Sequence, residues 1–313
     1  MIVSIIICTC NRAEHLRQTL AAMAGVCVPE TMPTELIVVD NASIDETAEV
    51  IQHCCLPNMV VRYLHEPRRG QCYARNTGIA AAQGEVILFT DDDVRPPKDW
   101  ITKMCGPIIS GQAQAVAGSI RMAPHLARPW MRRQHRDWLL DYDFSRVEAP
   151  HIMIGANMAF SRAVLEKVPE FDTELGPGAL GFSDDVLFSW QVETAGIPIV
   201  SAGDVAVEHH FDPVRLQRSE LLQRARQEGR VAAYLSYHWL HSNMRFSHLR
   251  LVKHTLNLVA WRLRNRHPQQ TLEGCSEQEL QFLVKVYFHQ QYLLERKRPR
   301  NYEKRGLVKL TRI

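Results

Sequence analysis

Four apolar runs, each followed by a segment of helical periodicity, constrain the fold of this chain more than any other feature. The first run, VSIIICT at residues 3–9, is rich in β-branched side chains, and similar runs follow at residues 35–40, 60–66 and 85–91. Continuous runs of this kind are typical of parallel strands that are buried on both faces. The alternation therefore predicts a doubly wound α/β fold, with a mostly parallel, Rossmann-like sheet flanked by helices.

Helix-boundary signals flank these strands. Ser43, followed by Glu46 three residues later, forms the pattern of a capping box at the start of the helix after the second strand. Gly84 is expected to close the helix after the third strand, and Pro97 to lie near the start of the helix after the fourth. These signals agree with the strand positions and support the same fold class.

The second half of the chain departs from this alternation. Residues 123–150 are irregular and rich in Arg and Trp, so we expect a long loop or lid there. A strand and a helix follow at residues 151–168, an amphipathic helix at 183–196 and a late strand at 198–210. From about residue 214 onward the pattern is helical, which predicts a helical C-terminal extension.

The charge is divided unevenly along the chain. Residues 1–228 contain 21 Lys and Arg against 29 Asp and Glu, whereas residues 229–272 contain seven basic residues and no acidic one. We therefore expect the two parts to have different roles. The sequence has no stretch of about 18 apolar residues, its first apolar run lacks a basic leader, and its eight cysteines form no CxxC pair. These features predict a cytoplasmic protein with reduced thiols and without a spanning helix.

Polar and acidic residues follow three of the expected strands at the ends where they leave the sheet. In an open α/β sheet, ligands bind beyond the carboxyl ends of the strands, so these residues are candidates for one site. They are Thr9, Asn11 and Arg12 after the first strand, Asp40, Asn41 and Ser43 after the second, and Asp91, Asp92 and Asp93 after the fourth.

The three consecutive aspartates have two interpretations. Uncompensated, three carboxylates on one turn repel one another, and a solvated turn is the simplest way to relieve this. The alternative is a site for Mg²⁺ or Mn²⁺, whose coordination shell is completed by water and diphosphate oxygens. The sequence contains no GxxxxGK[ST] and no GxGxxG after the first strand, so neither a P-loop nor a dinucleotide site is supported.

Seven blocks of sequence occur in one order along residues 1–215: VSIIICTCNR, ELIVVDNAS, GQCYARNTGI, GEVILFTDDDVRPP, GANMAFSR, SDDVLFSWQVETAG and the following pair of histidines. Together they resemble the family 2 glycosyltransferases of the GT-A fold. The resemblance implies a GT-A catalytic domain at residues 1–215, with a nucleotide-sugar-binding half at 1–120 and an acceptor half at 121–215. Residues 216–313 then form the helical extension.

The resemblance also implies what the site binds. The donor is a nucleotide-diphospho-sugar, with a UDP-sugar favoured, and the cofactor is Mn²⁺ or Mg²⁺. Asp40 resembles the carboxylate that receives the base, Asp91 faces the ribose, and Asp93 meets the metal together with His209 or His210. The residues implied in donor binding are Thr9, Asn11, Arg12, Asp40, Asn41, Ser43, Arg75, Asn76, Asp91 and Asp92.

The acceptor side is implied by the two later blocks. Gly155, Ala156 and Asn157 resemble the segment that floors the donor sugar and acceptor pocket. Asp184 and Asp185 match the usual Glu-Asp pair of the family, although Asp184 is one methylene shorter than the usual Glu. The resemblance makes Asp185 the general base of an inverting transfer and brings Asp184 to the acceptor. Helix N-capping is the structural alternative for this pair.

The basic segment at residues 238–267 has two interpretations that the sequence leaves open. It resembles a basic amphipathic helix on an anionic membrane, and it also fits a helix that packs on the catalytic domain. No nucleic-acid-binding module accompanies its charge. The sequence QRARQ at residues 223–227 lacks the Trp of the Gln-x-x-Arg-Trp motif of processive synthases. This difference favours transfer of one sugar per acceptor.

The predicted function is therefore metal-dependent hexosyl transfer onto a saccharide or lipid-linked acceptor, in cell-surface polysaccharide or glycolipid synthesis. The expected location is the cytoplasm or the inner face of the plasma membrane. Two alternatives remain. Asp91, Asp93 and Val94 fit the DxDx[TV] string of haloacid-dehalogenase-like phosphatases, in which Asp91 would be the nucleophile, although three strands precede it here. A non-catalytic nucleotide-sugar-binding protein is the other, and the pair Asp184 and Asp185 disfavours it.

Overall fold

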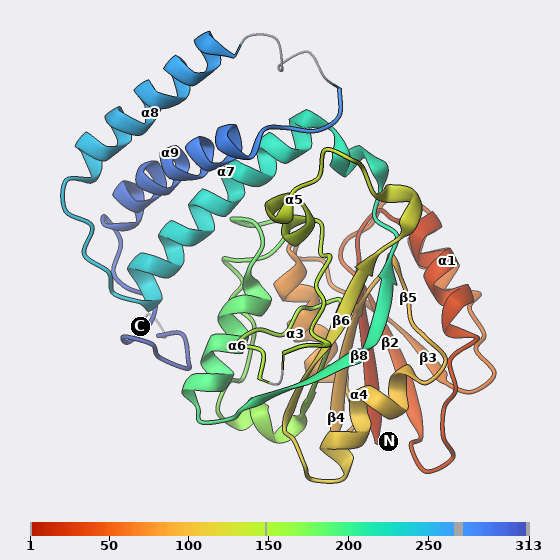
Figure 1. Ribbon diagram of the computed structural model, residues 1–313. Helices are drawn as coiled ribbons and strands as arrows, with labels where there is room; N and C mark the ends of the chain where they lie inside the picture. The colour runs from red at the N-terminus through yellow and green to blue at the C-terminus, as the bar shows by residue number, and fades with distance from the viewer. Residues whose placement is uncertain (1, 148, 266–271, 311–313) are drawn as a thin grey trace.

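The computed structural model describes residues 2–147, 149–265 and 272–310, and an eight-stranded sheet forms its centre (Figure 1). The strand order is β3-β2-β1-β4-β7-β6-β8-β5. The strands are β1 Val3–Thr9, β2 Thr34–Asp40, β3 Val60–His65, β4 Val86–Asp91, β5 Val94–Arg95, β6 Ala115–Met122, β7 Asn157–Ser161 and β8 Ile199–His209.

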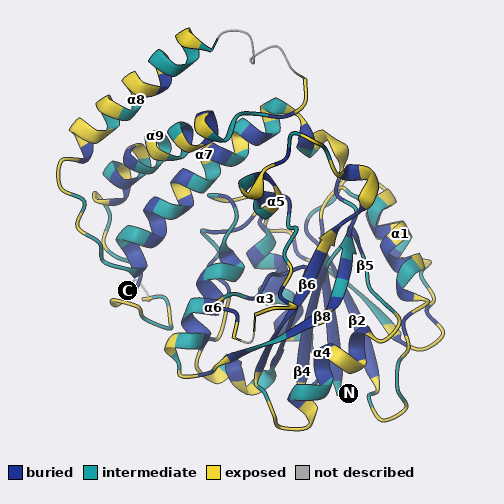
Figure 2. Cartoon of the chain, in the orientation of Figure 1, coloured by how far each residue is buried: buried dark blue, intermediate teal, exposed yellow. Residues whose placement is uncertain are grey.

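The first half of the sheet is parallel, as the sequence predicts. β1 lies between β2 and β4 and pairs in parallel with both, and β2 pairs in parallel with β3. The apolar residues of β1, β2 and β4 are almost fully buried because helices cover both faces of the sheet (Figure 2). β3 is an edge strand, and its residues are half-buried or exposed.

The second half of the sheet is mixed. β7 runs antiparallel to both β4 and β6, β5 runs antiparallel to β8, and β6 and β8 are parallel. The predicted α/β class with a mostly parallel sheet is confirmed. The strand order reverses at β1, where both neighbours pair in parallel, and the carboxyl ends of β1 and β4 therefore open onto one edge of the sheet.

Six α-helices accompany the described part of this sheet, and two of their predicted boundaries are wrong. α2 begins at Thr47 rather than at Ser43, because Ser43 Oγ accepts the Asn11 backbone N–H at 2.9 Å and Asp45 Oδ1 accepts the Thr47 N–H at 3.1 Å. α3 ends before Gly84, which packs on the backbone of β1. The helices are α1 Ala13–Met23, α2 Thr47–Gln52, α3 Gln71–Ala81, α4 Trp100–Ile109, α5 Arg133–Trp138 and α6 Asp184–Thr194.

In its described residues, the predicted lid at residues 123–150 contains the 3-10 helix Pro124–Leu126, the short helix α5 and a β-bridge at Tyr142, joined by loops and turns. Residue 148 of this segment, and residues 266 and 267 of the predicted basic segment, lie outside the described residues.

Three long helices form the C-terminal extension: α7 Arg218–Tyr234, α8 Ser247–Arg264 and α9 Glu277–Glu295. α7 packs on α9, and α8 packs on the other side of α9, so α8 lies on the outside of the molecule (Figure 1). Gly229 permits the close approach of α7 to α9, since a Cβ atom there would lie 2.4 Å from the carbonyl oxygen of Val284. Among the described residues, none of the helices combines the length and the apolar character that crossing a bilayer requires.

Candidate active site

A cavity of about 820 Å³ lies beyond the carboxyl ends of β1 and β4. One side is formed by the strand ends, a second by the segment before β7 and the start of α6, and a third by α7. Its walls combine carboxylate and guanidinium groups with apolar and aromatic side chains, among them Trp138, Tyr142 and Phe182. The cavity thus joins residues that lie far apart in the sequence.

The strand-end side contains Asp91, Asp92 and Asp93, which we call the edge aspartates. Arg12, which follows β1, pairs through one nitrogen with Asp92 at 2.7 Å and through the other with Asp93 at 2.6 Å. Thr9 Oγ1 donates a hydrogen bond to Asp92 Oδ2 at 2.7 Å. The structure therefore brings Thr9, Arg12 and the edge aspartates together, and all of them line the cavity.

Burial and ion pairing set the charge of the edge aspartates in opposite directions. Burial raises the pKa of Asp92 to about 7, and Arg12 acts against this shift. Burial also raises the pKa of Asp91. Burial would likewise raise the pKa of Asp93, but His209 and Arg12 outweigh it and hold that pKa well below its usual value. Asp93 is therefore the edge aspartate that is held in its ionised form.

Asp93 and His209, two residues that the sequence assigns to a metal, lie side by side in the cavity wall. His209 Nε2 lies 3.3 Å from Asp93 Oδ1, and its Nδ1 lies 3.0 Å from the carbonyl oxygen of Leu139, which orients the ring. Asp93 Oδ1 is buried, yet it accepts no hydrogen bond from any residue that the structure describes. The ionised, buried Oδ1 is thus faced by His209 Nε2 but held by no hydrogen bond of ordinary geometry, and such an oxygen fits a divalent cation.

The edge aspartates do not form a complete metal cage. Within residues 2–147, 149–265 and 272–310, no three His, Cys, Asp or Glu side chains are arranged to hold a metal ion. Mg²⁺ is commonly bound by one or two carboxylates, with water and substrate phosphates as its other ligands. The pair of Asp93 and His209 fits a site of this second kind.

His210 points away from this site. Its Nε2 lies 2.5 Å from Glu208 Oε1, and its ring lies beside that of His125. Its backbone N–H donates to the carbonyl oxygen of Asp93 at 2.7 Å, but its side chain does not line the cavity. Of the two histidines predicted for the metal, the geometry favours His209, because its ring lines the cavity beside Asp93, whereas the ring of His210 is paired with Glu208.

Asp184 and Asp185 lie at the start of α6 and have different partners. Asp184 forms a buried ion pair with Arg75, whose guanidinium lies beneath Gly155. A Cβ atom at Gly155 would lie 1.9 Å from Arg75 Nη2, so a side chain there would displace the guanidinium from its present position. Asp185 Oδ2 accepts the Gly155 backbone N–H at 3.0 Å, and Asp185 lines the cavity with Gly155 and Ala156. Asp184 is thus engaged by Arg75, whereas Asp185 can meet a ligand.

The environment of Asp185 suits proton transfer. Burial raises the pKa of Asp185 to about 6, the negative charge of Asp184 adds to this shift, and Arg75 acts against it. A carboxylate with this pKa is a stronger base than an ordinary aspartate and is still ionised near neutral pH. The cavity can therefore accept a proton at Asp185 while it holds a cation at Asp93.

Three predicted donor residues build the turns beside the cavity and do not line it. Asn11 Oδ1 accepts the backbone N–H of Ile44 at 2.8 Å, which joins the turn after β1 to the turn after β2. Asp40 Oδ1 accepts the Ser43 N–H at 2.9 Å, and the Tyr63 hydroxyl donates to Asp40 Oδ2 at 3.2 Å. Asn11, Asp40 and Ser43 therefore lie at the same sheet edge, at the rim of the site.

Three asparagines that the sequence assigns to the site take different positions. Asn41 lines the cavity, and its side chain bonds the backbone of the loop before α3. Asn76 exchanges hydrogen bonds of 2.9 and 2.8 Å with the backbone of Phe171. Asn157 is fully buried and accepts a hydrogen bond from Trp100 Nε1 at 2.9 Å. Asn76 and Asn157 thus support the fold beneath the cavity rather than line it, because their amides are used by backbone and core partners.

Sequence reasoning misses the third side of the cavity. Arg215 follows β8, Arg224 lies on α7, and both line the cavity. The Arg224 guanidinium lies 3.3 Å from the centre of the Phe182 ring and pairs with Glu228 at 3.5 Å. Both arginines fall at or beyond the expected domain boundary at residue 215. An arginine on an amphipathic helix carries no sequence signal that separates a cavity residue from a surface residue.

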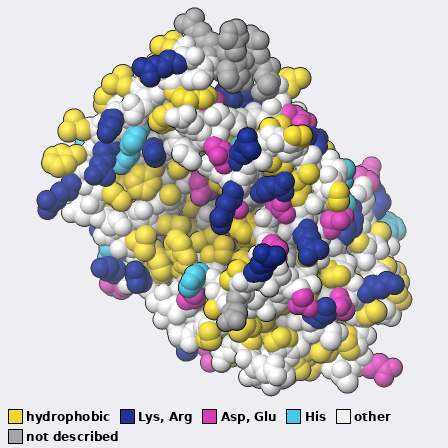
Figure 3. Space-filling view, in the orientation of Figure 1, with side chains coloured by type: hydrophobic (Ala, Val, Ile, Leu, Met, Phe, Trp, Pro, Cys, Tyr) yellow, Lys and Arg dark blue, Asp and Glu magenta, His cyan; other side chains and the backbone are white. Residues whose placement is uncertain are grey.

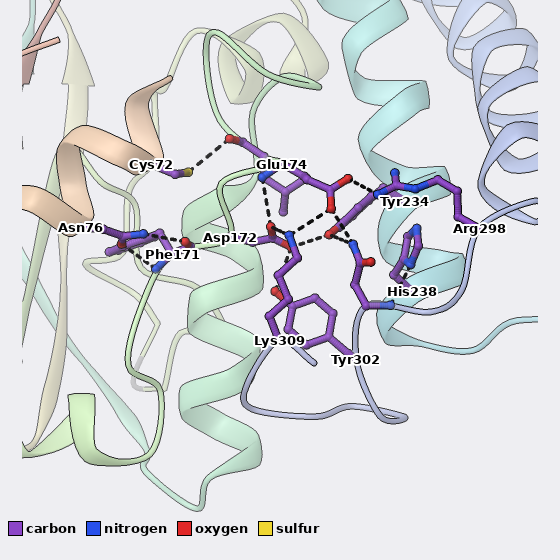
Figure 4. Close-up of polar contacts among 12 residues, drawn as sticks. Cys72, Asn76, Phe171, Asp172, Glu174, Tyr234, His238, Arg298, Tyr302 and Lys309 are labelled. Carbon is purple, nitrogen blue, oxygen red and sulfur yellow. Dashed lines mark hydrogen bonds and ion pairs between the residues drawn. The ribbon is translucent and has the colours of Figure 1, made fainter. Parts of the chain in front are cut away.

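The C-terminal segment holds the loop that leads into α6 (Figure 4). Asp172 accepts hydrogen bonds from the Tyr234 hydroxyl at 2.5 Å, the Tyr302 hydroxyl at 2.8 Å and Lys309 Nζ at 2.5 Å. Glu174 pairs with Lys309 at 3.0 Å. We call these five residues the loop cluster. The same loop continues into the cavity wall and then into α6, so the loop cluster positions one side of the site.

The fold and this cavity define a GT-A glycosyltransferase, and solved structures of that class are similar to it. One is the mannosyltransferase PcManGT from Pyrobaculum calidifontis in complex with GDP-Man and Mn²⁺, with a TM-score of 0.61 and 18% identity over 94% of this chain and 86% of that chain. Another is S. aureus TarS 1-349 in complex with UDP-GlcNAc, with a TM-score of 0.53 and 14% identity over 97% of this chain and 93% of that chain. At these identities the likeness establishes the fold.

The chain belongs to glycosyl transferase family 2, whose family model matches residues 4–169. It is 25% identical over 230 residues to glycosyltransferase AglE of Haloferax volcanii, and the matched region covers 73% of this chain and 72% of AglE. It is 32% identical over 129 residues to the succinoglycan biosynthesis protein ExoM of Rhizobium meliloti, and the matched region covers 40% of this chain and 41% of ExoM. The phosphatase and the non-catalytic alternatives are not favoured by these relatives.

Proposed function

We propose that this glycosyltransferase moves one hexosyl group from a nucleotide-diphospho-sugar to an acceptor hydroxyl, with inversion at the anomeric carbon. The observation that carries the proposal is the composition of the cavity beyond the strand ends. It contains an ionised Asp93 oxygen without a hydrogen-bond donor on one side and Asp185, a carboxylate with a raised pKa, on another. The first suits a metal-bound diphosphate and the second suits a general base.

The donor would bind along the strand-end side. In this proposal Asp40, at the rim, receives the base, Asp91 receives the ribose, and Thr9 and Asn41 border the nucleoside. A UDP-sugar is the favoured donor, and the structurally similar proteins crystallised with UDP-GlcNAc and with GDP-Man support a nucleotide sugar of either base. Asp92 is bound by Thr9 and Arg12, so its part is to fix the turn.

Asp93 and His209 would hold Mn²⁺ or Mg²⁺. When bound there, the cation supplies neutralisation of the charge on the diphosphate. Arg75, which the family resemblance assigns to donor binding, lines the cavity, and its guanidinium is paired with Asp184 under Gly155. Asp184 and Arg75 therefore act by positioning the Gly155 segment and the start of α6. Arg215 adds a positive charge to the cavity on the side of α7.

The chemical step that this arrangement supports begins at Asp185. An Asp185 carboxylate oxygen takes the proton of the acceptor hydroxyl, whose oxygen forms a bond to the anomeric carbon. The bond from that carbon to the diphosphate oxygen breaks, and its electron pair leaves with the nucleoside diphosphate. Attack from the face opposite the leaving group inverts the configuration. Burial of Asp185 favours this proton transfer, because it raises the pKa of the carboxylate.

The acceptor in this proposal is a saccharide or a lipid-linked saccharide at the inner face of the plasma membrane. The names of the curated relatives support it, since they include a succinoglycan biosynthesis protein and a glucosyl-dolichyl phosphate glucuronosyltransferase. Trp138, Tyr142 and Phe182 give the acceptor side an aromatic wall against which a sugar ring can pack. Transfer of one sugar per acceptor rests on the sequence QRARQ at residues 223–227, which lacks the Trp of processive synthases.

The test is nucleoside diphosphate release from a panel of UDP-glucose, UDP-galactose, UDP-GlcNAc and GDP-mannose in the presence of Mn²⁺. We expect the protein to turn over at least one donor, and Asp185→Asn to lower turnover by about 10³-fold while leaving donor binding intact. Asp204→Asn is the matched control, because Asp204 is 70% exposed and lies outside the cavity wall. Cleavage of a phosphate monoester without release from any nucleotide sugar would overturn the proposal in favour of the phosphatase.

A further inference from the structure

One face of α8 carries an exposed apolar stripe. Its members are Leu249, Val252, Leu256, Val259 and Leu263, with exposed fractions of 68, 57, 63, 48 and 57%. Successive members are separated alternately by three and four residues, so they lie along one side of the helix. We call them the α8 stripe. Monomeric soluble proteins rarely expose a contiguous apolar surface of this kind without a binding role.

The opposite face of α8 is fixed to the protein. Leu258 is buried against α9, and Trp261 Nε1 donates to Gln278 Oε1 at 3.1 Å. Arg262 Nε donates to Glu279 Oε1 at 2.9 Å. The helix therefore packs on α9 with one face and presents the other to the outside. It is a packed helix, as one interpretation of the sequence predicts, and it still has an apolar face that is free to meet a membrane, as the other requires. A docked helix with an exposed apolar face needs a partner other than its own domain.

The charge around the α8 stripe has one sign. α8 contains four Lys and Arg residues and no Asp or Glu. Arg250, Lys253 and Arg264 are exposed beside the stripe, as is Arg245 just before the helix. Figure 3 shows Lys and Arg side chains interspersed with hydrophobic ones along the edge of the molecule over α8. Phe246, which is 70% exposed, extends the apolar surface at the start of the helix.

This charge pattern selects among partners. A second copy of the chain, packed stripe to stripe, would bring Arg250, Lys253 and Arg264 against identical cations, with no acid on α8 to pair with them. An anionic bilayer meets both requirements, because its acyl boundary takes the apolar face and its headgroups take the flanking cations.

We propose that α8 docks this protein on an anionic membrane surface through the α8 stripe and its flanking basic residues. The inference goes beyond the proposed function and stands without it. It also gives the three-helix layer a role, since α9 connects the membrane-facing helix to α7, which forms a wall of the cavity. The protein would thus be held at the surface where lipid-linked acceptors are exposed.

Vesicle flotation of the full chain tests the proposal. We expect flotation with vesicles that contain phosphatidylglycerol and phosphatidylcholine, and none with pure phosphatidylcholine. The double variant Leu256→Ser and Val259→Ser should lose flotation, because it interrupts the apolar face. The double variant Lys253→Gln and Arg264→Gln should weaken partitioning by roughly 25-fold, since each basic residue near an anionic surface contributes about fivefold.

Matched controls separate the stripe from general surface effects. Ile44→Ser removes an apolar side chain that is 86% exposed on the catalytic part, and Arg133→Gln removes a cation whose side chain is 94% exposed. Both should float like the unaltered protein. Circular dichroism and thermal melting of every variant should match the unaltered protein, because all the altered side chains are wholly or largely exposed.

Two results would overturn the proposal. One is a protein that remains with the soluble fraction for both vesicle types. The other is a dimer, measured by light scattering, that the Leu256→Ser and Val259→Ser variant dissociates while flotation is unaffected. Nucleotide-sugar turnover in the absence of vesicles, measured on the same variants, is expected to be unchanged. A failure of glycosyl transfer would appear in that assay and not in flotation, so the two proposals fail separately.

Discussion

Two groups of buried and half-buried carboxylates, the edge aspartates and the acids of the loop cluster, differ in how their oxygens are satisfied. Asp172 of the loop cluster receives two tyrosine hydroxyls and a lysine ammonium (Figure 4). Asp93 of the edge aspartates is ion-paired through Oδ2 with Arg12, whereas its Oδ1 has His209 Nε2 at 3.3 Å but accepts no hydrogen bond of ordinary geometry from the described residues. The loop cluster lies between packed segments, whereas the edge aspartates line a cavity.

The difference indicates what each group is for. A buried carboxylate whose oxygens all have donors stabilises the segments that supply the donors. A buried, ionised oxygen without a hydrogen bond has a desolvation cost that no protein group offsets, and a bound ligand can offset it. We therefore assign the loop cluster to structure and the edge aspartates to binding. Metal removal and Asp172→Asn test these two assignments, and the predictions on Asp185 test the chemistry of the same cavity.

The largest effect is expected from Asp185→Asn. Loss of the base should lower kcat by about 10³-fold, within the range of roughly 10² to 10⁴ typical of general bases. Donor affinity and melting temperature should stay close to those of the unaltered enzyme. Steady-state kinetics and calorimetry measure these quantities. Turnover within about threefold of the unaltered enzyme would show that another group takes the proton.

Metal removal should have the next largest effect. Treatment with EDTA is expected to lower turnover by about 10²- to 10³-fold, because neutralisation of the diphosphate charge is lost. Addition of Mn²⁺ or Mg²⁺ in excess should restore it. The contacts of the loop cluster involve no metal, so EDTA should leave the fold intact and the far-ultraviolet circular dichroism spectrum unchanged. Full activity after chelation contradicts a metal role for Asp93 and His209.

Asp172→Asn should act on stability. An amide in place of the carboxylate weakens the bonds from Tyr234, Tyr302 and Lys309 and leaves Lys309 without its charge partner at that position. We expect the free energy of unfolding to fall by about 3 kcal/mol. Tyr302→Phe, which removes one hydrogen bond, should lower it by only about 1 kcal/mol. Denaturant unfolding measures both variants, and an unaltered midpoint for Asp172→Asn would remove the structural assignment.

The pH dependence should give the smallest effect. A general base works when it is deprotonated, and burial raises the pKa of Asp185 to about 6. We therefore expect kcat/KM to fall about tenfold for each pH unit below 6 and to level off above about pH 7. Stability measured over the same range shows whether the loss arises from unfolding. A profile that is flat from pH 5 to 7 would contradict Asp185 as the base.

Much of the fold can be predicted because its signals are local. A continuous β-branched run such as residues 3–9 indicates a buried parallel strand wherever it occurs. The capping box at Ser43 fails for the opposite reason. Its hydroxyl is taken by the backbone of Asn11, a partner 32 residues away, and no local pattern reports such a contact.

The candidate site is predictable only on the side that the strand ends form. Thr9, Arg12 and the edge aspartates meet because parallel strands end at one edge. Arg215 and Arg224 reach the same cavity from the other end of the chain through the packing of α7, which depends on tertiary contacts. Asn157 shows the opposite error of sequence reasoning. It is predicted to line the pocket, but its polar side chain is buried among core partners and is not exposed to the cavity.

The most direct test of the account is the melting-temperature rise produced by Mn²⁺ together with UDP. A ligand that binds the folded state stabilises it by mass action, by about 2.7 kcal/mol at a hundredfold excess over Kd. We predict the same rise for the unaltered protein and for Asp172→Asn, which starts from a lower melting temperature, and no rise for Asp93→Ala. An equal rise in Asp93→Ala, or its loss in Asp172→Asn alone, would contradict the assignment of binding to the edge aspartates.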